Sequence, residues 1–302
     1  MTYIKLETIS IEKEQLHIIR DDVFPFVGGG NKSRKALYYE EYMIKNGYNA
    51  IVTTGGIHSN HNRAMALIAT RNNWPCHLVY HGKRERFFNE CGNPQLVKAT
   101  NATYEFVDTD KIASAMDQAV VSFKSLGLNP LYVTGGGHDL PGGLAYINAT
   151  TELVSIFRQN NWFPKAIFLA CGTGSTLAGI AAGLIKEQLS TKVIGVSIAR
   201  NKGRAESVIS DFSSLLCKSQ NITYQKNYKI KDDYLYGGYE SYTSKMKIWL
   251  ADIIKKTGII FDTTYSGKAL WGAYSYAKER EIELKDILFW HTGGILNYLA
   301  QQ

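Results

Sequence analysis

The chain has 302 residues, of which 45% are hydrophobic and 20% are charged, and its formal net charge is +7. This composition is typical of a globular protein with enough apolar side chains for one large or two ordinary domains. No apolar run is long enough to cross a bilayer, and the start MTYIKLETISIEKEQ is charged, so we predict neither a transmembrane helix nor a secretory signal. A cytoplasmic protein without a membrane partner is therefore expected.

The remaining composition excludes two further classes. The positive charges are scattered among acidic residues and form no stripe interleaved with aromatic residues, so no nucleic-acid partner is expected. The cysteines form no CxxC pair, which argues against a disulfide framework and a zinc ribbon; they are Cys76, Cys91, Cys171 and Cys217. Because His58 and His61 have no third ligand nearby in the sequence, no metal site is predicted.

The first distinctive element is a predicted helix behind three glycines, in the stretch VGGGNKSRKALYYEEY at 27–42. Lys32, Arg34 and Lys35 stand at the start of this helix, where the helix dipole disfavours cations. Such a basic helix start is either a solvated turn or a site that meets an anion. Taken alone, Lys32 is more simply explained as a surface lysine.

Short apolar runs that end at or near glycine recur along the rest of the chain and predict buried strands. They are NAIVTTGG at 49–56, PCHLVYHG at 75–82, PLYVTGGG at 130–137, KAIFLACGTG at 165–174, KVIGVSIA at 192–199 and DILFWHTGG at 286–294. Helical patterns separate them, for example HNRAMALIATRNN and STLAGIAAGLIKEQ. This alternation predicts an α/β protein with parallel, twisted sheets flanked by helices, and ligands bound at the carboxyl ends of the strands.

The strand count also suggests two lobes. We expect a small α/β domain at 47–147, inserted into a large domain formed by 1–46 and 148–302, with the ligand between them. Residues 201–242 contain fewer apolar runs and are predicted to form a helix followed by an irregular stretch at the active site.

The run CGTGSTLAG at 171–179 is the clearest candidate for a binding loop. It follows an apolar strand and opens a helix, so its backbone N–H groups would form a phosphate cup at the positive helix end. The spacing matches neither GxGxxG nor a Walker loop, which favours a phosphorylated ligand smaller than a nucleotide. The alternative is a tight turn that packs helix on strand. The candidate residues are Gly172, Thr173, Gly174, Ser175 and Thr176.

A phosphate cup gives the opening lysine a role. A lysine on a glycine-rich segment near a phosphate site can form a Schiff base with an aldehyde cofactor. Pyridoxal 5′-phosphate carries both the phosphate and the aldehyde. Lys32 is therefore the candidate attachment residue.

Several motifs together resemble one family of pyridoxal-phosphate enzymes, the D-cysteine desulfhydrase and 1-aminocyclopropane-1-carboxylate deaminase family. GGNKSRKALYYEEY and TTGGIHSNHNRAMALIA carry the resemblance most directly. VTGGGHDLPGGLAYINATTEL, CGTGSTLAG, DDYLYGGY, DTTYSGKALWGAYSYA and LFWHTGG follow in the family's order. The resemblance implies the tryptophan synthase β-like fold, fold type II of these enzymes, and a homodimer. The segment before Asp21 departs from the family pattern.

The resemblance also implies roles for individual residues. Lys32 holds the cofactor as a Schiff base and then moves protons, and Lys35 lies near the phosphate. Asn60 donates a hydrogen bond to the ring oxygen of the cofactor, and Ser59 faces the substrate. Gly172 to Thr176 form the phosphate cup.

Two tyrosines and two hydroxyl residues complete the implied site. Tyr239 and Tyr265 match the tyrosines that face the substrate. After Tyr265 this chain has Ser266, where the ring-opening deaminases carry glutamate and the desulfhydrases usually carry threonine. A hydroxyl from Ser266 or Thr292 would leave the pyridine nitrogen largely neutral, which favours β-elimination over opening of a cyclopropane ring.

The preferred function is a lyase that removes the α proton of a small amino acid and eliminates a β substituent, giving a keto acid and ammonia. D-cysteine would give pyruvate, ammonia and hydrogen sulfide. Alternatives with the same cofactor are a β-substitution synthase, a racemase-like enzyme and a 1-aminocyclopropane-1-carboxylate deaminase. A non-catalytic binding protein on the same fold, including one that binds RNA, is the most distant alternative, because it would need none of Lys32, Asn60, Tyr239 and Tyr265.

Overall fold

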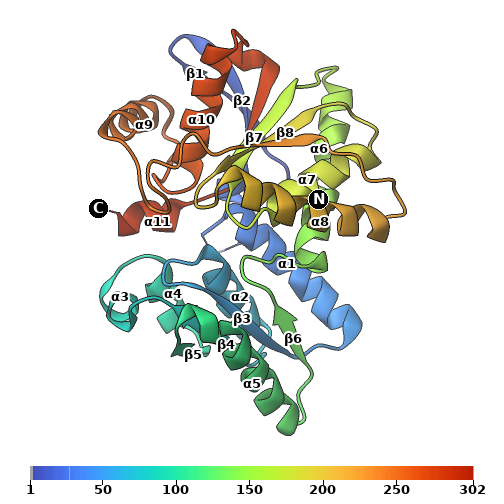
Figure 1. The fold of residues 1–302 in the computed structure, drawn as a ribbon, viewed down its shortest axis with the longest axis vertical. Helices are drawn as coiled ribbons and strands as arrows, with labels where there is room; N and C mark the ends of the chain where they lie inside the picture. Colours follow the sequence, from blue (N-terminus) through green and yellow to red (C-terminus); the bar gives the residue numbers. More distant parts are fainter. Residues whose placement is uncertain (1–2, 27, 302) are drawn as a thin grey trace.

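The computed structural model describes residues 3–26 and 28–301. Residues 1–2 and 302, at the ends of the expected large domain, and residue 27, in the glycine stretch, lie outside the described residues. The described chain forms two lobes, each built on its own sheet, with a six-stranded sheet in one and a four-stranded sheet in the other (Figure 1).

The larger sheet has the order β1-β2-β10-β7-β8-β9. Its strands are β1 (Leu6–Ile11), β2 (Glu14–Arg20), β7 (Ala166–Cys171), β8 (Lys192–Ser197), β9 (Tyr228–Lys231) and β10 (Ile287–His291). All neighbours pair in parallel except β1 and β2, which pair antiparallel. The segment that departs from the family pattern is thus an ordered hairpin at the sheet edge, turned by Glu12 and Lys13 at positive φ.

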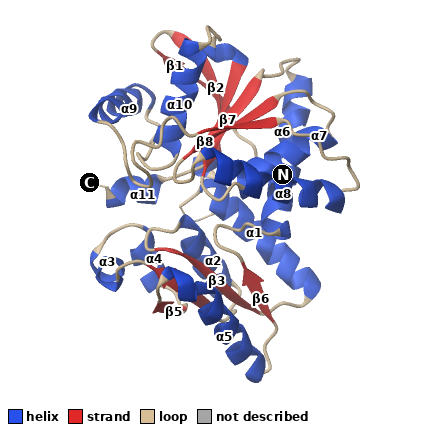
Figure 2. Cartoon of the chain, in the orientation of Figure 1, coloured by secondary structure: helices blue, strands red, loops and turns tan. Residues whose placement is uncertain are grey.

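Helices cover both faces of this sheet (Figure 2). They are α6 (Leu140–Gln159), α7 (Ser175–Lys186), α8 (Lys202–Ser219), α9 (Ser244–Thr257) and α10 (Ser266–Glu279). Ile167 and Leu169 of β7 pack in the core under α6, α7 and α8, whereas Phe168 packs in the core under α9 and α10. Successive side chains of a strand point to opposite faces, so an unbroken apolar run is required where both faces are covered.

The smaller sheet has the order β5-β4-β3-β6 and is entirely parallel. Its strands are β3 (Ala50–Gly56), β4 (Cys76–His81), β5 (Thr103–Phe106) and β6 (Pro130–Val133). The nearby helices are α1 (Gly30–Asn46), α2 (Asn60–Arg71), α3 (Arg84–Asn89), α4 (Asn93–Lys98) and α5 (Ile112–Ser125). The short helix α11 (Ile295–Ala300) ends the described chain, and single turns of 3₁₀ helix lie at Asp21–Val23, Thr109–Lys111 and Leu284–Asp286.

Two helices connect the lobes, so the lobes do not divide simply after residues 46 and 147. Tyr39 and Met43 of α1 pack into the core of the smaller sheet. Tyr146 and Ile147 of α6 already pack into the core of the larger sheet, so the expected boundary after residue 147 falls inside a helix.

The segment at 201–242 consists of α8, the short edge strand β9 and then an irregular stretch, so the expected irregular region is interrupted by a strand. Among the described helices, none is long and apolar enough to cross a membrane.

Candidate active site

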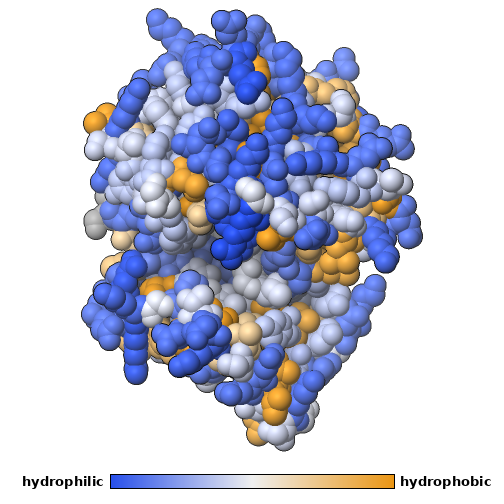
Figure 3. All heavy atoms as spheres, in the orientation of Figure 1, coloured by the Kyte–Doolittle hydropathy of each residue, from blue (hydrophilic) through white to orange (hydrophobic). Residues whose placement is uncertain are grey.

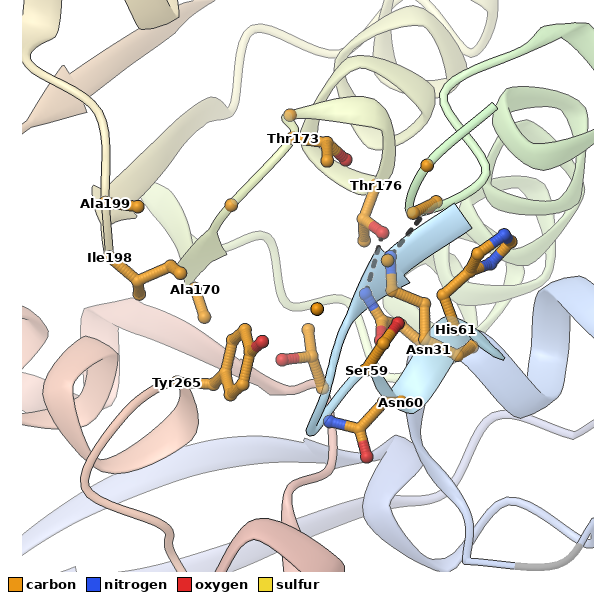
Figure 4. Close-up of a pocket in the computed structure, with 18 of the residues that line it drawn as sticks. Asn31, Ser59, Asn60, His61, Ala170, Thr173, Thr176, Ile198, Ala199 and Tyr265 are labelled. Carbon is orange, nitrogen blue, oxygen red and sulfur yellow. Dashed lines mark hydrogen bonds between the residues drawn. The ribbon is translucent and has the colours of Figure 1, made fainter. Parts of the chain in front are cut away.

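A cavity of about 700 Å³ lies between the lobes, where the surface narrows to a waist (Figure 3). The residues that follow β3, β6, β7 and β10 line it, as expected for the carboxyl ends of parallel strands. Ten of the residues predicted from the sequence line this cavity: Lys32, Ser59, Asn60, Gly172, Thr173, Gly174, Thr176, Tyr239, Tyr265 and Thr292. Figure 4 shows the side chains of the two lobes directed into one space.

The glycine run before α1 allows two backbones to meet closely. Gly28, Gly29 and Gly30 all have positive φ. A Cβ atom at Gly30 would lie 2.7 Å from the carbonyl oxygen of Thr292, and the next amide, of Asn31, donates to that oxygen at 2.9 Å. Only glycine fits this conformation and this approach. The start of α1 is therefore fastened to the end of β10.

Lys32 lies in the first turn of α1 and faces the cavity. Its Nζ donates to the carbonyl oxygen of Gly136 at 2.7 Å, across the cavity from the end of β6. Burial lowers the pKa of Lys32 to about 8, and the negative charge of Asp139 acts in the opposite direction by raising it. A lysine with this pKa is partly neutral near neutral pH, and the neutral amine is the nucleophilic form.

The predicted phosphate cup follows β7 and opens the twelve-residue helix α7. Gly174 has a φ of +91°, and a Cβ atom there would lie 2.4 Å from a side-chain atom of Ile209, so glycine is required. Asn31 Nδ2 donates to Thr176 Oγ1 at 2.9 Å, which ties the cup to α1 (Figure 4). Free N–H groups at a helix start suit an anion.

Lys35 lies behind this cup and does not line the cavity. Its fully buried Nζ donates to Ser175 Oγ at 2.5 Å and to the carbonyl oxygen of Gly137 at 3.1 Å. Burial, together with the positive charge of Lys32, lowers its pKa well below the ordinary value. Ser175 likewise points away from the cavity. These two predicted cofactor ligands support the cup from behind.

Ser59 and Asn60 stand at the start of α2, on the side of the smaller lobe. Ser59 caps the helix, and its Oγ accepts from the amide of Asn62 at 3.1 Å. The amide group of Asn60 is held from both ends: its Nδ2 donates to Asn297 Oδ1 at 2.5 Å, and its Oδ1 accepts from Asn93 Nδ2 at 3.1 Å. The Asn60 side chain is thus oriented before any ligand binds.

Tyr239 and Tyr265 form one unit on the side of the larger lobe. Their hydroxyl oxygens lie 2.6 Å apart and their rings meet edge to face. The amide of Tyr265 donates to Oδ2 of the buried Asp262 at 2.8 Å. Burial raises the pKa of Tyr239 to about 12 and raises that of Tyr265 well above its ordinary value. Both hydroxyls are therefore protonated at neutral pH and can donate a proton.

A profile of the family described as "Pyridoxal-phosphate dependent enzyme" matches residues 2–293. The chain belongs to this family. A Pyrococcus furiosus protein, provisionally named as a 1-aminocyclopropane-1-carboxylate deaminase, is 29% identical over 283 residues, covering 93% of this chain and 84% of that protein. D-cysteine desulfhydrase of Serratia proteamaculans is 28% identical over 286 residues, covering 93% of this chain and 86% of that protein.

A solved structure supports the same relationship. The crystal structure of a homologue of 1-aminocyclopropane-1-carboxylate deaminase is similar with a TM-score of 0.84 and 27% identity, covering 95% of this chain and 86% of that chain. The two-lobed arrangement of parallel sheets is therefore fold type II of the pyridoxal-phosphate enzymes, as predicted, and pyridoxal 5′-phosphate is its cofactor.

The residues of the cavity fit this cofactor. The cup offers N–H groups for a phosphate, and Lys32 offers an amine of lowered pKa for an aldehyde. Asn60 offers a fixed amide for a ring oxygen. His58 and His61 do not compete for these roles, because His58 pairs with Glu90, and His61 Nε2 lies 2.8 Å from Thr53 Oγ1.

The structure places Ser266 differently from the expectation that its hydroxyl faces the cofactor ring. Ser266 is fully buried outside the cavity lining, and its Oγ donates to Asp262 Oδ1 at 2.8 Å. The cause is the start of α10, where Asp262 also accepts from the amides of Thr264, Tyr265 and Ser266. Of the two residues predicted to offer a hydroxyl, Thr292 lines the cavity.

Sequence reasoning assigned no site role to five polar residues of the cavity, namely Asn31, Thr54, His61, His81 and Arg200. Asn31 precedes Lys32, His81 ends β4, and Arg200 follows β8 and donates from Nη1 to the carbonyl oxygen of Thr173 at 3.2 Å. The sequence did offer a signal for His81 and Arg200, because each lies at or just after the end of an apolar run already assigned as a strand. Asp262, which accepts from the amide of Tyr265, was also missed although it lies in the quoted motif DTTYSGK.

Proposed function

We propose that the protein is a pyridoxal-phosphate lyase that removes the α proton of a small amino acid and eliminates its β substituent, with D-cysteine as the candidate substrate. The products would be pyruvate, ammonia and hydrogen sulfide. The observation that carries the proposal is the shared cavity, in which the Lys32 amine faces the phosphate cup and a pair of protonated tyrosines. The name of the Serratia relative supports the same reaction.

Lys32 has two tasks in this proposal. It would hold the cofactor through its amine, and that amine in its neutral form would accept the α proton of the substrate. The bound cofactor supplies a ring that takes up the electron pair left behind. Burial keeps the lysine amine basic enough to accept a proton but neutral enough to be available, because its pKa is about 8.

The tyrosine pair supplies the proton for the departing group. Tyr265 is half-buried and Tyr239 is 44% exposed, so their shared hydrogen bond connects the cavity with the solvent side. A thiolate leaving from the β carbon would accept the proton of the nearer hydroxyl, and the second hydroxyl would replace it. The pair thus acts as a short proton relay.

The lining of the cavity favours elimination over ring opening. Among the described residues that line it, none is an aspartate or a glutamate. Asp262 is the nearest carboxylate of the tyrosine motif, but its oxygens are occupied by the amides of 264–266 and by Ser266. Thr292 is then the hydroxyl available to a pyridine nitrogen, which stays largely neutral beside it. This supports the desulfhydrase reaction over cyclopropane opening, while β-substitution remains the second candidate.

We also propose a homodimer, which the family resemblance implies, and a location in the cytoplasm.

The test is an absorbance spectrum of the purified protein and of Lys32→Ala, with pyridoxal phosphate added to both. Keto acid is then assayed with D-cysteine, D-serine and 1-aminocyclopropane-1-carboxylate. The exposed Lys45 at the far end of α1 provides the control variant Lys45→Ala. The proposal expects a visible band in the wild type and in Lys45→Ala, no such band in Lys32→Ala, and pyruvate from D-cysteine. A band without keto acid from any substrate would favour β-substitution, and no band in the wild type would refute the assignment of Lys32.

A further inference from the structure

Lys268 is a fully buried cation outside the cavity lining, and the proposed chemistry gives it no task. It lies in the first turn of α10, three residues after Tyr265. Its Nζ donates to the carbonyl oxygens of Leu235 at 3.2 Å and of Gly238 at 3.1 Å. Burying an ammonium group costs free energy unless hydrogen bonds compensate it. The groups that accept its hydrogen bonds therefore indicate the role of this lysine.

The two carbonyls belong to the turn that carries Tyr239. Within this turn, four residues have positive φ: Tyr236, Gly237, Gly238 and Glu240. Tyr236 and Glu240 bear side chains, for which this backbone region is strained. Strained backbone persists only where the surroundings hold it. The turn therefore depends on outside contacts.

Besides the hydrogen bond between Tyr239 and Tyr265, three polar contacts reach the turn from other elements of the described chain, and they are unequal. Trp271 Nε1, one helical turn after Lys268, donates to Tyr236 Oη at 2.8 Å. Arg86 of the smaller lobe lies 3.8 Å from Glu240, but both side chains are solvent exposed, and such pairs contribute little. Among the described residues outside the turn, Lys268 is the one that donates charge-assisted hydrogen bonds, the stronger kind, to the main chain next to Tyr239.

We propose that Lys268 is a positioning residue: its ammonium group holds the turn at 235–239 so that the Tyr239 hydroxyl meets the Tyr265 hydroxyl in the cavity. Because one helix start carries both Tyr265 and Lys268, the same element sets both halves of the tyrosine pair. This inference rests on the proposed function in one respect, namely that the tyrosine pair serves the reaction.

The pKa of Lys268 makes its contact with the turn dependent on pH. Burial lowers its pKa to about 8, and the carboxylate of Asp262 opposes that shift. The group is therefore an ammonium at neutral pH and becomes a neutral amine as the pH rises through about 8. The two carbonyls then lose their charged donor, and the turn is held less firmly.

The experiment compares the holoenzymes of wild type, Lys268→Met and the control Lys278→Met, which removes an exposed lysine from the other end of α10. Hydrogen exchange is measured at 232–241, together with turnover of D-cysteine and the absorbance of the cofactor. For Lys268→Met we expect faster exchange confined to this segment and an unchanged visible band. Because small misplacements of a reacting group cost up to about 100-fold, we expect turnover to fall roughly 10- to 100-fold.

A double variant separates positioning from a general structural effect. If Lys268 acts through Tyr239, the change Lys268→Met reduces turnover much less in a Tyr239→Phe background than in the wild type. Equal losses in both backgrounds, or unchanged exchange at 232–241, would overturn the inference. Lys268→Gln, which keeps an N–H donor, is measured in the same way if Lys268→Met does not fold. Loss of the tyrosine role itself would be seen separately, as a Tyr239→Phe single variant with wild-type turnover.

Discussion

The hydroxyl oxygens of Tyr239 and Tyr265 lie 2.6 Å apart, although one residue is on an irregular turn and the other is at the start of α10. Burial raises the pKa of both phenols, so the pair stays protonated through the physiological range. Tyr239 is 44% exposed and Tyr265 is half-buried, so the pair leads from the solvent side into the cavity.

The first prediction concerns this direction. Tyr265→Phe removes the inner hydroxyl, and because positioned proton donors contribute about 10²- to 10⁴-fold, turnover of D-cysteine should fall within that range. Tyr239→Phe leaves the inner donor in place and should cost less. Tyr132→Phe, at a partly exposed position on β6, is the control. Steady-state pyruvate release measures all three, and equal turnover of Tyr265→Phe and wild type would contradict the relay.

The second prediction concerns the pH dependence of cofactor attachment. In the proposed function, the neutral form of Lys32 bonds to the cofactor aldehyde, and the pKa of Lys32 is about 8 in place of the ordinary 10.5. The attachment rate should therefore rise with pH below about 8 and level off above it, because the amine is then fully deprotonated. Stopped-flow absorbance after mixing apoprotein with pyridoxal phosphate gives this rate. A rate that still climbs steeply between pH 9 and pH 10 would show that the lysine is not perturbed.

The third prediction concerns Lys35. Lys35→Met leaves Ser175 Oγ and the carbonyl oxygen of Gly137 without their buried donor. An unsatisfied buried group costs about 1–3 kcal/mol, so the free energy of unfolding should fall by that order. Because Ser175 opens α7 behind the cup, the affinity for inorganic phosphate should fall as well. Urea unfolding and calorimetric titration test both effects.

The control for Lys35 is Lys45→Met on the same helix, where the side chain is exposed and no change is expected. If Lys35→Met lowered stability without weakening phosphate binding, the support that we assign to the cup would be wrong.

The fourth prediction concerns a glycine beside the cavity. Gly294 has a φ of +121°, and a Cβ atom there would lie 2.2 Å from Asp262 Oδ1. Gly294→Ala should therefore destabilise the protein by about 1–3 kcal/mol or more through backbone strain, and should displace Asp262 from the tyrosine motif. Gly203→Ala is the matched control, because nothing lies within 4 Å of its Cβ position in α8. Thermal unfolding of the two variants should differ clearly, and similar midpoints would refute this close packing.

Local sequence determined the elements of the fold and the outline of the site. Apolar runs ended by glycine predicted β3, β4, β6, β7, β8 and β10, because a buried strand and a tight turn are both short-range features. The phosphate cup was predicted for the same reason, since strand, glycine turn and helix start adjoin along the chain. The motif pair around Lys32 and Asn60 indicated the family, and the family profile confirmed it.

Only the tertiary structure decided where side chains point and which distant residues meet. The Ser266 hydroxyl donates to Asp262 outside the cavity lining, and the Lys35 amine donates to Ser175 behind the cup. Both contacts form because buried polar groups need hydrogen-bond partners. The pairing of β1 with β2, and the meeting of Lys268 with the turn before Tyr239, join segments whose contact no local pattern encodes. Residue identities therefore predicted the kind of chemistry, whereas long-range packing determined which of these residues line the cavity.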